Sequence, residues 1–78
     1  MKTRKRSERD DYLKNVGLNI RLARKKRGLS QEALALAADL DRSYVGGVER
    51  GERNIAILNL KKIADALSIP IKELVEHI

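Results

Sequence analysis

The segment of residues 30–51, SQEALALAADLDRSYVGGVERG, constrains the fold of this chain more than any other stretch. Its apolar spacing predicts two short helices, over residues 30–39 and 42–50, with only a tight turn between them. The apolar residues of each predicted helix share one face: Leu34, Ala35 and Ala38 in the first, Val45 and Val48 in the second. The rest of the chain must therefore supply the elements on which these two faces pack.

The second predicted helix also has a polar and basic outward face, made of Arg42, Ser43, Gly46, Gly47 and Arg50. Glycines inside a helix each cost about 0.8–1.0 kcal/mol relative to alanine, so selection for stability alone would avoid them. Here they leave bare backbone that an external partner can approach closely. We therefore interpret the two helices as a helix-turn-helix whose second helix enters the major groove of DNA. Because few side chains remain to read bases, part of the specificity is expected to come from DNA shape.

Three further helices are predicted, which makes the chain an all-α domain of five helices. Residues 11–26 form the first, with Gly17 on its apolar stripe, where another helix can approach closely. Residues 57–67 form the fourth, and Pro70 suits the first turn of a fifth that runs to about the C-terminus. The inward residues of the first and fourth helices are Leu13, Val16, Ile20 and Ala23, then Ile57, Leu60, Ile63, Ala64 and Leu67. With 78 residues, no Phe and no Trp, the chain has room for one small domain with an aliphatic core.

Capping residues support these boundaries. Asp10 or Asp11 can cap the first helix, and Gly28 is expected to end it because glycine accepts a positive φ. Ser30 is the expected N-cap of the second helix, and Asp41 that of the third. Each cap satisfies backbone groups that the helix itself leaves without partners.

The first ten residues, MKTRKRSERD, are dense in charge and contain Met1 as their only hydrophobic residue. We expect a flexible basic arm over residues 1–10, followed by a folded domain over residues 11–78. The cations of the arm could follow phosphates or a minor groove, or they could simply be solvated. The cations in question are Lys2, Arg4, Lys5 and Arg6.

Charge and composition narrow the class of function. The net charge of +6 attracts polyanions, which means nucleic acid first and an anionic membrane second. The chain has no Cys, and its only His is His77, so it lacks the parts of thiolate or histidine metal sites and of a histidine dyad. No metal, no cofactor and no enzyme activity are therefore expected. No apolar run approaches the roughly 18 residues of a membrane helix, and a cytoplasmic protein is expected.

A set of residues spread over most of the chain is shared with a known family. The matching positions are IR at residues 20–21, Arg24, GLSQEALA at residues 28–35, Leu40, YV at residues 44–45, VERG at residues 48–51 and KIADAL at residues 62–67. Together they strongly resemble the Cro/C1-type (XRE-like) helix-turn-helix family over residues 12–75. The resemblance implies a lambda-repressor-like fold in which helices 2 and 3 form the DNA-binding motif.

Within that family, residues 41–54, DRSYVGGVERGERN, most resemble the controller proteins of restriction–modification systems. Those proteins are small homodimeric regulators that bind operators upstream of their own gene and of the endonuclease gene. Phage and chromosomal Cro/C1-type repressors share similar stretches, so they remain an alternative. An antitoxin-like regulator that binds a protein partner is a further alternative.

The resemblance, together with the outward face described above, implies a set of DNA-binding residues. Gln31 is expected at the DNA backbone or groove edge, Tyr44 near the backbone, and Arg42 at the bases. The fork of Arg42 can bond guanine O6 and N7, which is worth about 1–3 kcal/mol of discrimination. The loop after the third helix is expected to contact phosphate, and Arg50 is a further candidate for such a contact. The complete predicted set is Gln31, Arg42, Ser43, Tyr44, Gly46, Gly47, Arg50, Arg53 and Asn54.

Two other residues of the resemblance are expected to hold the fold and not to bind DNA. Arg24 and Glu49 match an ion pair that links the first helix to the third, and breaking such a pair strands one charge. The chain departs from the family at Asp39, where glycine is usual, so Asp39 is expected in the left-handed region. It also departs at Ala56, which leaves the fourth helix without a side-chain cap.

An apolar surface on the last two helices predicts a homodimer. Leu58 is expected to point outward, and with the apolar residues of the fifth helix it would form a large apolar patch, which marks an interface. The predicted dimer residues are Leu58, Ile69, Ile71, Val75 and Ile78. Alternatively, the fifth helix folds these residues into its own core. The sequence thus predicts a homodimeric regulator of a pseudo-palindromic double-stranded operator. The family resemblance also implies Glu52 as a candidate contact to RNA polymerase.

Overall fold

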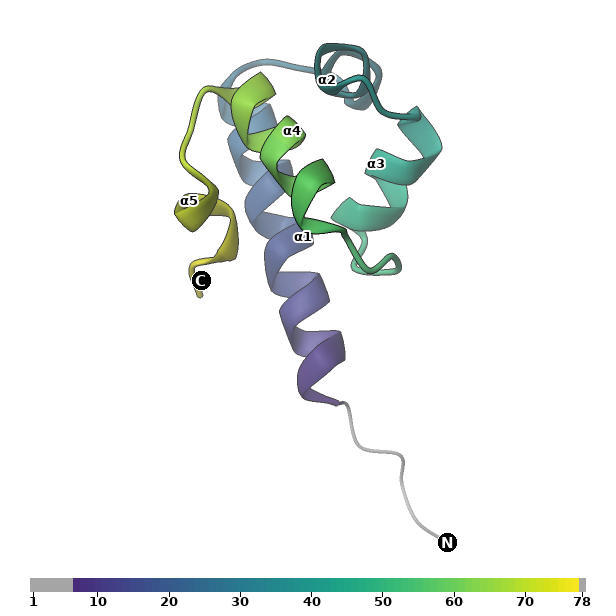
Figure 1. The fold of residues 1–78 in the computed structure, drawn as a ribbon, viewed down its shortest axis with the longest axis vertical. Coiled ribbons are helices and arrows are strands. Elements are labelled where there is room, and N and C mark those ends of the chain that lie inside the picture. Colours follow the sequence, from purple (N-terminus) through teal and green to yellow (C-terminus); the bar gives the residue numbers. More distant parts are fainter. Residues whose placement is uncertain (1–6, 78) are drawn as a thin grey trace, which may run out of the picture.

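The computed structural model describes residues 7–77 and consists of five helices joined by short loops (Figure 1). The helices are α1 (Glu8–Lys26), α2 (Gln31–Ala38), α3 (Arg42–Glu49), α4 (Ile57–Leu67) and α5 (Ile71–Val75). Over residues 7–77 there is no strand, so the prediction of an all-α domain with five helices is confirmed. None of the described helices is long and apolar enough to cross a membrane.

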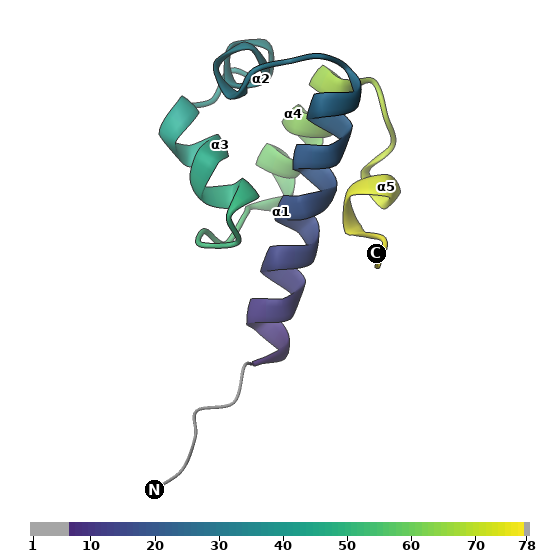
Figure 2. The same ribbon diagram turned by 180° about the vertical axis from the view of Figure 1, so that it is seen from behind.

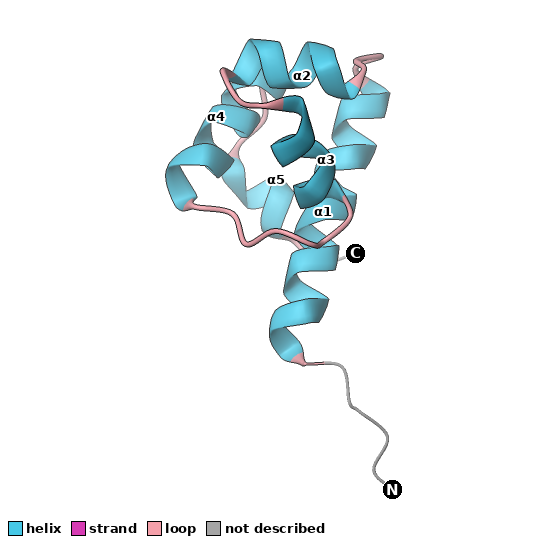
Figure 3. Ribbon diagram, turned by 90° about the vertical axis from the view of Figure 1, so that its right-hand side faces the viewer, coloured by secondary structure: helices cyan, strands magenta, loops and turns pink. Residues whose placement is uncertain are grey.

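The long helix α1 is the support on which the other helices assemble. Figures 1 and 2 show α2 and α3 on one side of α1 and α5 on the other, while the first turns of α1 extend beyond the helical body. Helix α4 packs mainly on α2, and α3 packs on both α1 and α2. In Figure 3, α3 faces the viewer with α2 above it and the loop to α4 below it. The helix predicted to bind DNA is thus displayed on one side of the domain.

The core is aliphatic, as composition requires, and every described helix contributes to it. Ile20, Leu34, Ile63, Leu67 and Leu74 are fully buried. Burying one such side chain contributes about 1.5–3 kcal/mol relative to leaving it exposed. The buried hydrophobic residues are Val16, Ile20, Leu34, Ala35, Ala38, Val45, Val48, Leu60, Ile63, Ala64, Leu67 and Leu74.

The predicted close approach at Gly17 is confirmed. A Cβ atom placed on Gly17 would collide with the carbonyl oxygens of Val48 and Glu49 at the end of α3. Backbone atoms cannot swing away as a flexible side chain can. The absence of a side chain at this position therefore sets how closely α1 and α3 pack.

Helix α1 begins earlier than predicted, at Glu8 and not at Asp11. Its N-cap is Ser7, whose hydroxyl oxygen accepts a hydrogen bond of 3.1 Å from the backbone N–H of Asp10. Three carboxylates in the first turn favour the positive end of the helix dipole, which explains the earlier start. The arm predicted over residues 1–10 is therefore too long: residues 8–10 are helical, and residues 1–6 with their four cations lie outside the described residues.

Three further details at the other helices correct the sequence prediction. Ile57 was predicted to face inward but is 66% exposed, because it starts α4 one turn before the first core residue, Leu60. Asp41 is the N-cap of α3, but its side chain makes no capping hydrogen bond. Pro70 is the N-cap of α5 and not part of its first turn, and α5 ends at Val75.

Candidate nucleic-acid interface

The turn between α2 and α3 is built as the sequence predicted. The Ser30 hydroxyl oxygen accepts a hydrogen bond of 3.0 Å from the backbone N–H of Ala33, which caps α2. Asp39 has φ 57° and ψ 50°, in the left-handed region. The backbone N–H of Leu40 then donates to the carbonyl of Ala35 over 2.9 Å. These contacts fix the direction in which α3 leaves α2.

The predicted ion pair between Arg24 and Glu49 is confirmed and is bidentate. The Arg24 Nε and Nη2 atoms donate to the two Glu49 carboxylate oxygens over 2.7 and 2.9 Å, and Nη1 donates to the Leu29 carbonyl over 2.8 Å. Only 9% and 2% of the two side chains are exposed. Hydrogen bonding to Glu49 raises the pKa of Arg24, so the guanidinium is charged throughout the physiological range. The pair joins α1 to the end of α3.

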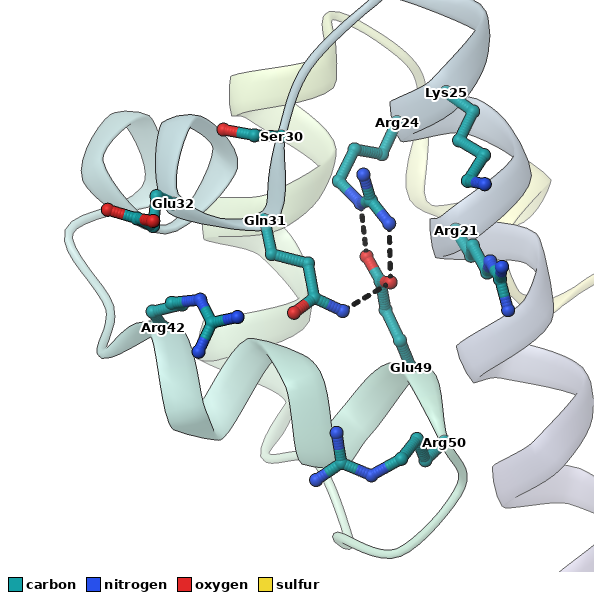
Figure 4. Close-up of a pocket in the computed structure, with 9 residues that line it drawn as sticks. All are labelled: Arg21, Arg24, Lys25, Ser30, Gln31, Glu32, Arg42, Glu49 and Arg50. Carbon is teal, nitrogen blue, oxygen red and sulfur yellow. Dashed lines mark hydrogen bonds and ion pairs between the residues drawn. The ribbon is translucent and has the colours of Figure 1, made fainter.

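Gln31 is held by the same carboxylate. Its Nε2 atom donates a hydrogen bond of 3.0 Å to Glu49 Oε1 (Figure 4). The carboxylate accepts hydrogen bonds only, so it selects the amide nitrogen and turns the carbonyl oxygen of Gln31 away from itself. That oxygen lies 3.3 Å from where a Cβ of Gly46 would be. The predicted DNA-binding residue Gln31 is thus oriented by the buried ion pair.

Gly46 and Gly47 do not form the bare backbone face that the sequence suggested, because both residues are buried. A Cβ on Gly46 would lie 3.2 Å from the Arg50 side chain, and one on Gly47 would lie 2.7 Å from Arg53 Cγ. Polar side chains therefore lie flat across the two glycines. The interpretation as uncovered backbone is wrong: the glycines make room for Arg53, Arg50 and Gln31 on the surface of α3.

On the α4 side of the motif, Tyr44 and Arg53 form a second cluster. The Arg53 guanidinium lies 5.9 Å from the centroid of the Tyr44 ring, within the range of a cation–π interaction. The Asn59 side chain of α4 donates a hydrogen bond of 3.1 Å to the Tyr44 hydroxyl. Tyr44 is half-buried, while Arg53 and the adjacent Asn54 are exposed.

The remaining predicted DNA-binding residues are all exposed, but they differ in whether their side chains are already paired. Arg42 and Ser43 are exposed at the start of α3. Arg50 is exposed as well, but its Nε atom donates over 3.0 Å to a carboxylate oxygen of Glu52. Side chains at this pair are 59% and 62% exposed, and exposed pairs are weak. Arg50 is therefore available to another anion once Glu52 is displaced.

Some of the predicted DNA-binding residues border a hollow between α1, α2 and α3, which Figure 4 shows. Its lining contains the predicted residues Gln31, Arg42 and Arg50 and also brings in Arg21 and Lys25 of α1. These two cations were not among the predicted DNA-binding residues. Their spacing of four residues on one helix was the signal that could have identified them.

Only part of the apolar surface predicted for dimerisation is exposed to solvent. Leu58 and Val75 are 73% and 42% exposed. Ile69 and Ile71 are half-buried and pack against the core, as the alternative prediction required. Ile78 lies outside the described residues, and Ile57 adds an exposed apolar side chain beside Leu58.

Comparison with known proteins agrees with this geometry. Residues 20–74 match the family described as helix-turn-helix. The control protein C.MunI of Mycoplasma sp is 43% identical over 58 residues, which is 74% of this chain and 78% of that protein.

Two solved structures extend the comparison. The crystal structure of the restriction-modification controller protein C.AhdI from Aeromonas hydrophila superposes with a TM-score of 0.78 at 53% identity, covering 80% of this chain and 94% of that one. A nucleoprotein complex of C.Esp1396I gives a TM-score of 0.71 at 35% identity, covering 85% and 96%. All three proteins resemble the chain over most of their own length.

Proposed function

Because the chain belongs to the helix-turn-helix family, we propose that it binds a pseudo-palindromic DNA operator as a homodimer. It is a transcriptional regulator of the helix-turn-helix type and not an enzyme, similar to the control proteins of restriction–modification systems. We further propose that it serves as the controller protein of such a system. The alternative is a phage or other chromosomal repressor of the same fold.

One observation carries the proposal: the polar residues around α3 are held in place by hydrogen bonds between α3 and the other helices. The Arg24–Glu49 pair orients Gln31 on one side, and Asn59 orients Tyr44 on the other. Side chains that are fixed in advance lose less entropy when a ligand binds. This arrangement suits a rigid surface that meets the edges of a DNA groove.

Within this surface the proposed tasks are divided. Arg42 and Ser43, exposed at the start of α3, face the base edges, and Arg42 reads guanine. Arg50, Arg53 and Asn54 contact phosphates, which position the protein without specifying sequence. Gly46 and Gly47 contribute by letting the side chains above them lie close to α3.

A single domain presents one such surface and can read one half-site. We propose that two copies associate through the exposed apolar side chains of Ile57 and Leu58 on α4 and Val75 on α5. Ile69 and Ile71 are half-buried and pack against the core, so they present less surface to a partner. A two-fold symmetric pair of protomers requires an operator with half-sites about one helical turn apart.

Selection of bound duplexes from a random pool tests the proposal directly. The expected result is an enriched pseudo-palindrome with half-site centres about 10 base pairs apart. Light scattering should give the mass of two chains. Enrichment of a single asymmetric site, or of no site, would contradict the proposed operator binding. Genes for an endonuclease and a methyltransferase beside this one would support the controller role.

A further inference from the structure

The hollow between α1, α2 and α3 carries more positive charge than the proposed DNA contacts use. Cations outnumber acids in its lining: Arg21, Arg24, Lys25, Arg42 and Arg50 stand against Glu32 and Glu49. Arg24 and Glu49 neutralise each other in the buried pair, and Arg50 is paired with Glu52. One acid of the lining, Glu32, then remains against three cations: Arg42, which the proposed function uses, and Arg21 and Lys25, which it does not.

Within residues 7–77, the side chains of Arg21 and Lys25 make no hydrogen bond and no ion pair. Both are exposed, and they lie four residues apart on α1, so their side chains are neighbours on one face of the helix. Like charges at this spacing repel each other and destabilise a helix. A nearby anion would remove that repulsion.

The opposite wall of the hollow is also suited to an anion. It contains Ser30 and Gln31, the N-cap and first residue of α2 (Figure 4). The first backbone N–H groups of a helix have no acceptor within it, and they stand at the positive end of the helix dipole. An anion in the hollow would thus meet cationic side chains from α1 close to the positive end of the α2 dipole.

We propose that Arg21 and Lys25 contact the phosphodiester backbone of DNA beside the bases that α3 reads. The proposal rests on the proposed function, because DNA must be docked on α3 to bring its backbone to α1. These two cations extend the protein–DNA contact from the helix-turn-helix to the preceding helix. Since phosphates carry no sequence, they raise affinity for every duplex alike.

The test compares two double variants that each lose two positive charges. One is Arg21→Gln with Lys25→Gln. The matched control is Lys26→Gln with Lys62→Gln, at exposed residues of α1 and α4 that do not line the hollow. A cooperative urea transition for both variants and for the unmodified protein would establish that all three fold. Affinity for the selected operator and for a random duplex is then measured over a range of salt concentrations.

For the first variant, the slope of log K against log salt should fall in magnitude by roughly 1.8 per bound protomer, from two contacts at about 0.9 each. Operator and random duplex should lose affinity by the same factor, and the control should keep the slope of the unmodified protein. Equal slopes in the two double variants would overturn the proposal. A second result would also overturn the proposal: the Arg21/Lys25 variant no longer binds inorganic phosphate, yet its slope of log K against log salt for DNA is unchanged.

Failure of this inference is distinguishable from failure of the proposed function. If the unmodified protein prefers its operator but the two double variants behave alike, only the contact from α1 is rejected. If the unmodified protein shows no preference for any duplex, the proposed operator binding itself is rejected.

Discussion

Glu49 and Arg50 are neighbours at the end of α3, and each forms an ion pair of similar length, yet the two pairs have different consequences. The Arg24–Glu49 pair spans 2.7 Å with 9% and 2% of its side chains exposed, whereas the Arg50–Glu52 pair spans 3.0 Å with 59% and 62% exposed. The buried pair has lost its water and cannot exchange partners without stranding a charge. The exposed pair is screened and can exchange Glu52 for a phosphate. The two pairs have similar lengths, so the difference in burial explains why Arg24–Glu49 stabilises the fold while Arg50 can leave Glu52 to bind DNA.

The largest expected effect is on the buried pair. Glu49→Ala should lower the free energy of unfolding by about 3–5 kcal/mol, because it leaves the Arg24 guanidinium buried and unpaired. Urea denaturation measures this loss. The matched change Glu52→Ala at the exposed pair should alter stability by less than about 0.5 kcal/mol.

The double replacement Arg24→Met with Glu49→Leu sharpens the contrast, because it removes both charges and keeps the volume. It should recover most of the stability lost in Glu49→Ala. A loss in Glu49→Ala no larger than in Glu52→Ala would show that burial does not distinguish the two pairs.

A second comparison concerns glycines on either side of the buried pair. Gly17→Ala should destabilise the domain by about 1–3 kcal/mol, because its Cβ would meet backbone carbonyls of Val48 and Glu49. Gly46→Ala should be neutral or stabilising by up to about 1 kcal/mol, because its Cβ meets only the flexible ends of Arg50 and Gln31. Thermal or urea unfolding of both variants decides the point, and equal losses would contradict the packing described here.

A smaller effect is expected at Gly47, where DNA binding should change more than stability. In Gly47→Ala the new Cβ would displace the Arg53 side chain from its position over Tyr44. Immobilising one freed side chain costs roughly 0.5–1.5 kcal/mol, so an Arg53 that is no longer held in advance should weaken DNA binding by about 2- to 10-fold. Fluorescence anisotropy with operator and random duplex should show the same loss for both. A loss confined to the operator would mean that Arg53 reads bases.

The smallest expected effect is at the exposed pair and has the opposite sign. Glu52→Gln should raise affinity for all duplexes by about 1.4- to 5-fold, because Arg50 no longer has to leave a carboxylate to reach a phosphate. The same binding assay measures this gain. Unchanged or weaker binding would show that Arg50 does not contact the DNA backbone.

The sequence predicted what depends on local chemistry and on spacing. Gly28 and Asp39 have the positive φ expected of them, and Ser30 caps α2. The close approach at Gly17 was predicted from its place on an apolar stripe, whereas the Arg24–Glu49 pair came only from the family resemblance.

What the sequence did not predict depends on side chains that meet across the fold. Gly46 and Gly47 were predicted to be uncovered backbone, because the sequence of α3 does not show that the side chains of Arg53 and Gln31 lie over them. Ile57 fits the apolar period of α4, but the period does not show that the core begins one turn later, at Leu60. Arg21 and Lys25 had no predicted role in DNA binding, because the sequence does not show that α2 and α3 enclose a hollow beside them.

The most direct test of the account is the sequence preference of Arg42→Ala, with Arg53→Ala as its control. The ratio of operator affinity to random-duplex affinity should fall about five-fold or more in Arg42→Ala, because one bidentate base contact is lost. In Arg53→Ala both affinities should fall together and the ratio should stay the same. An unchanged ratio in Arg42→Ala would contradict the claim that α3 reads the operator through this residue.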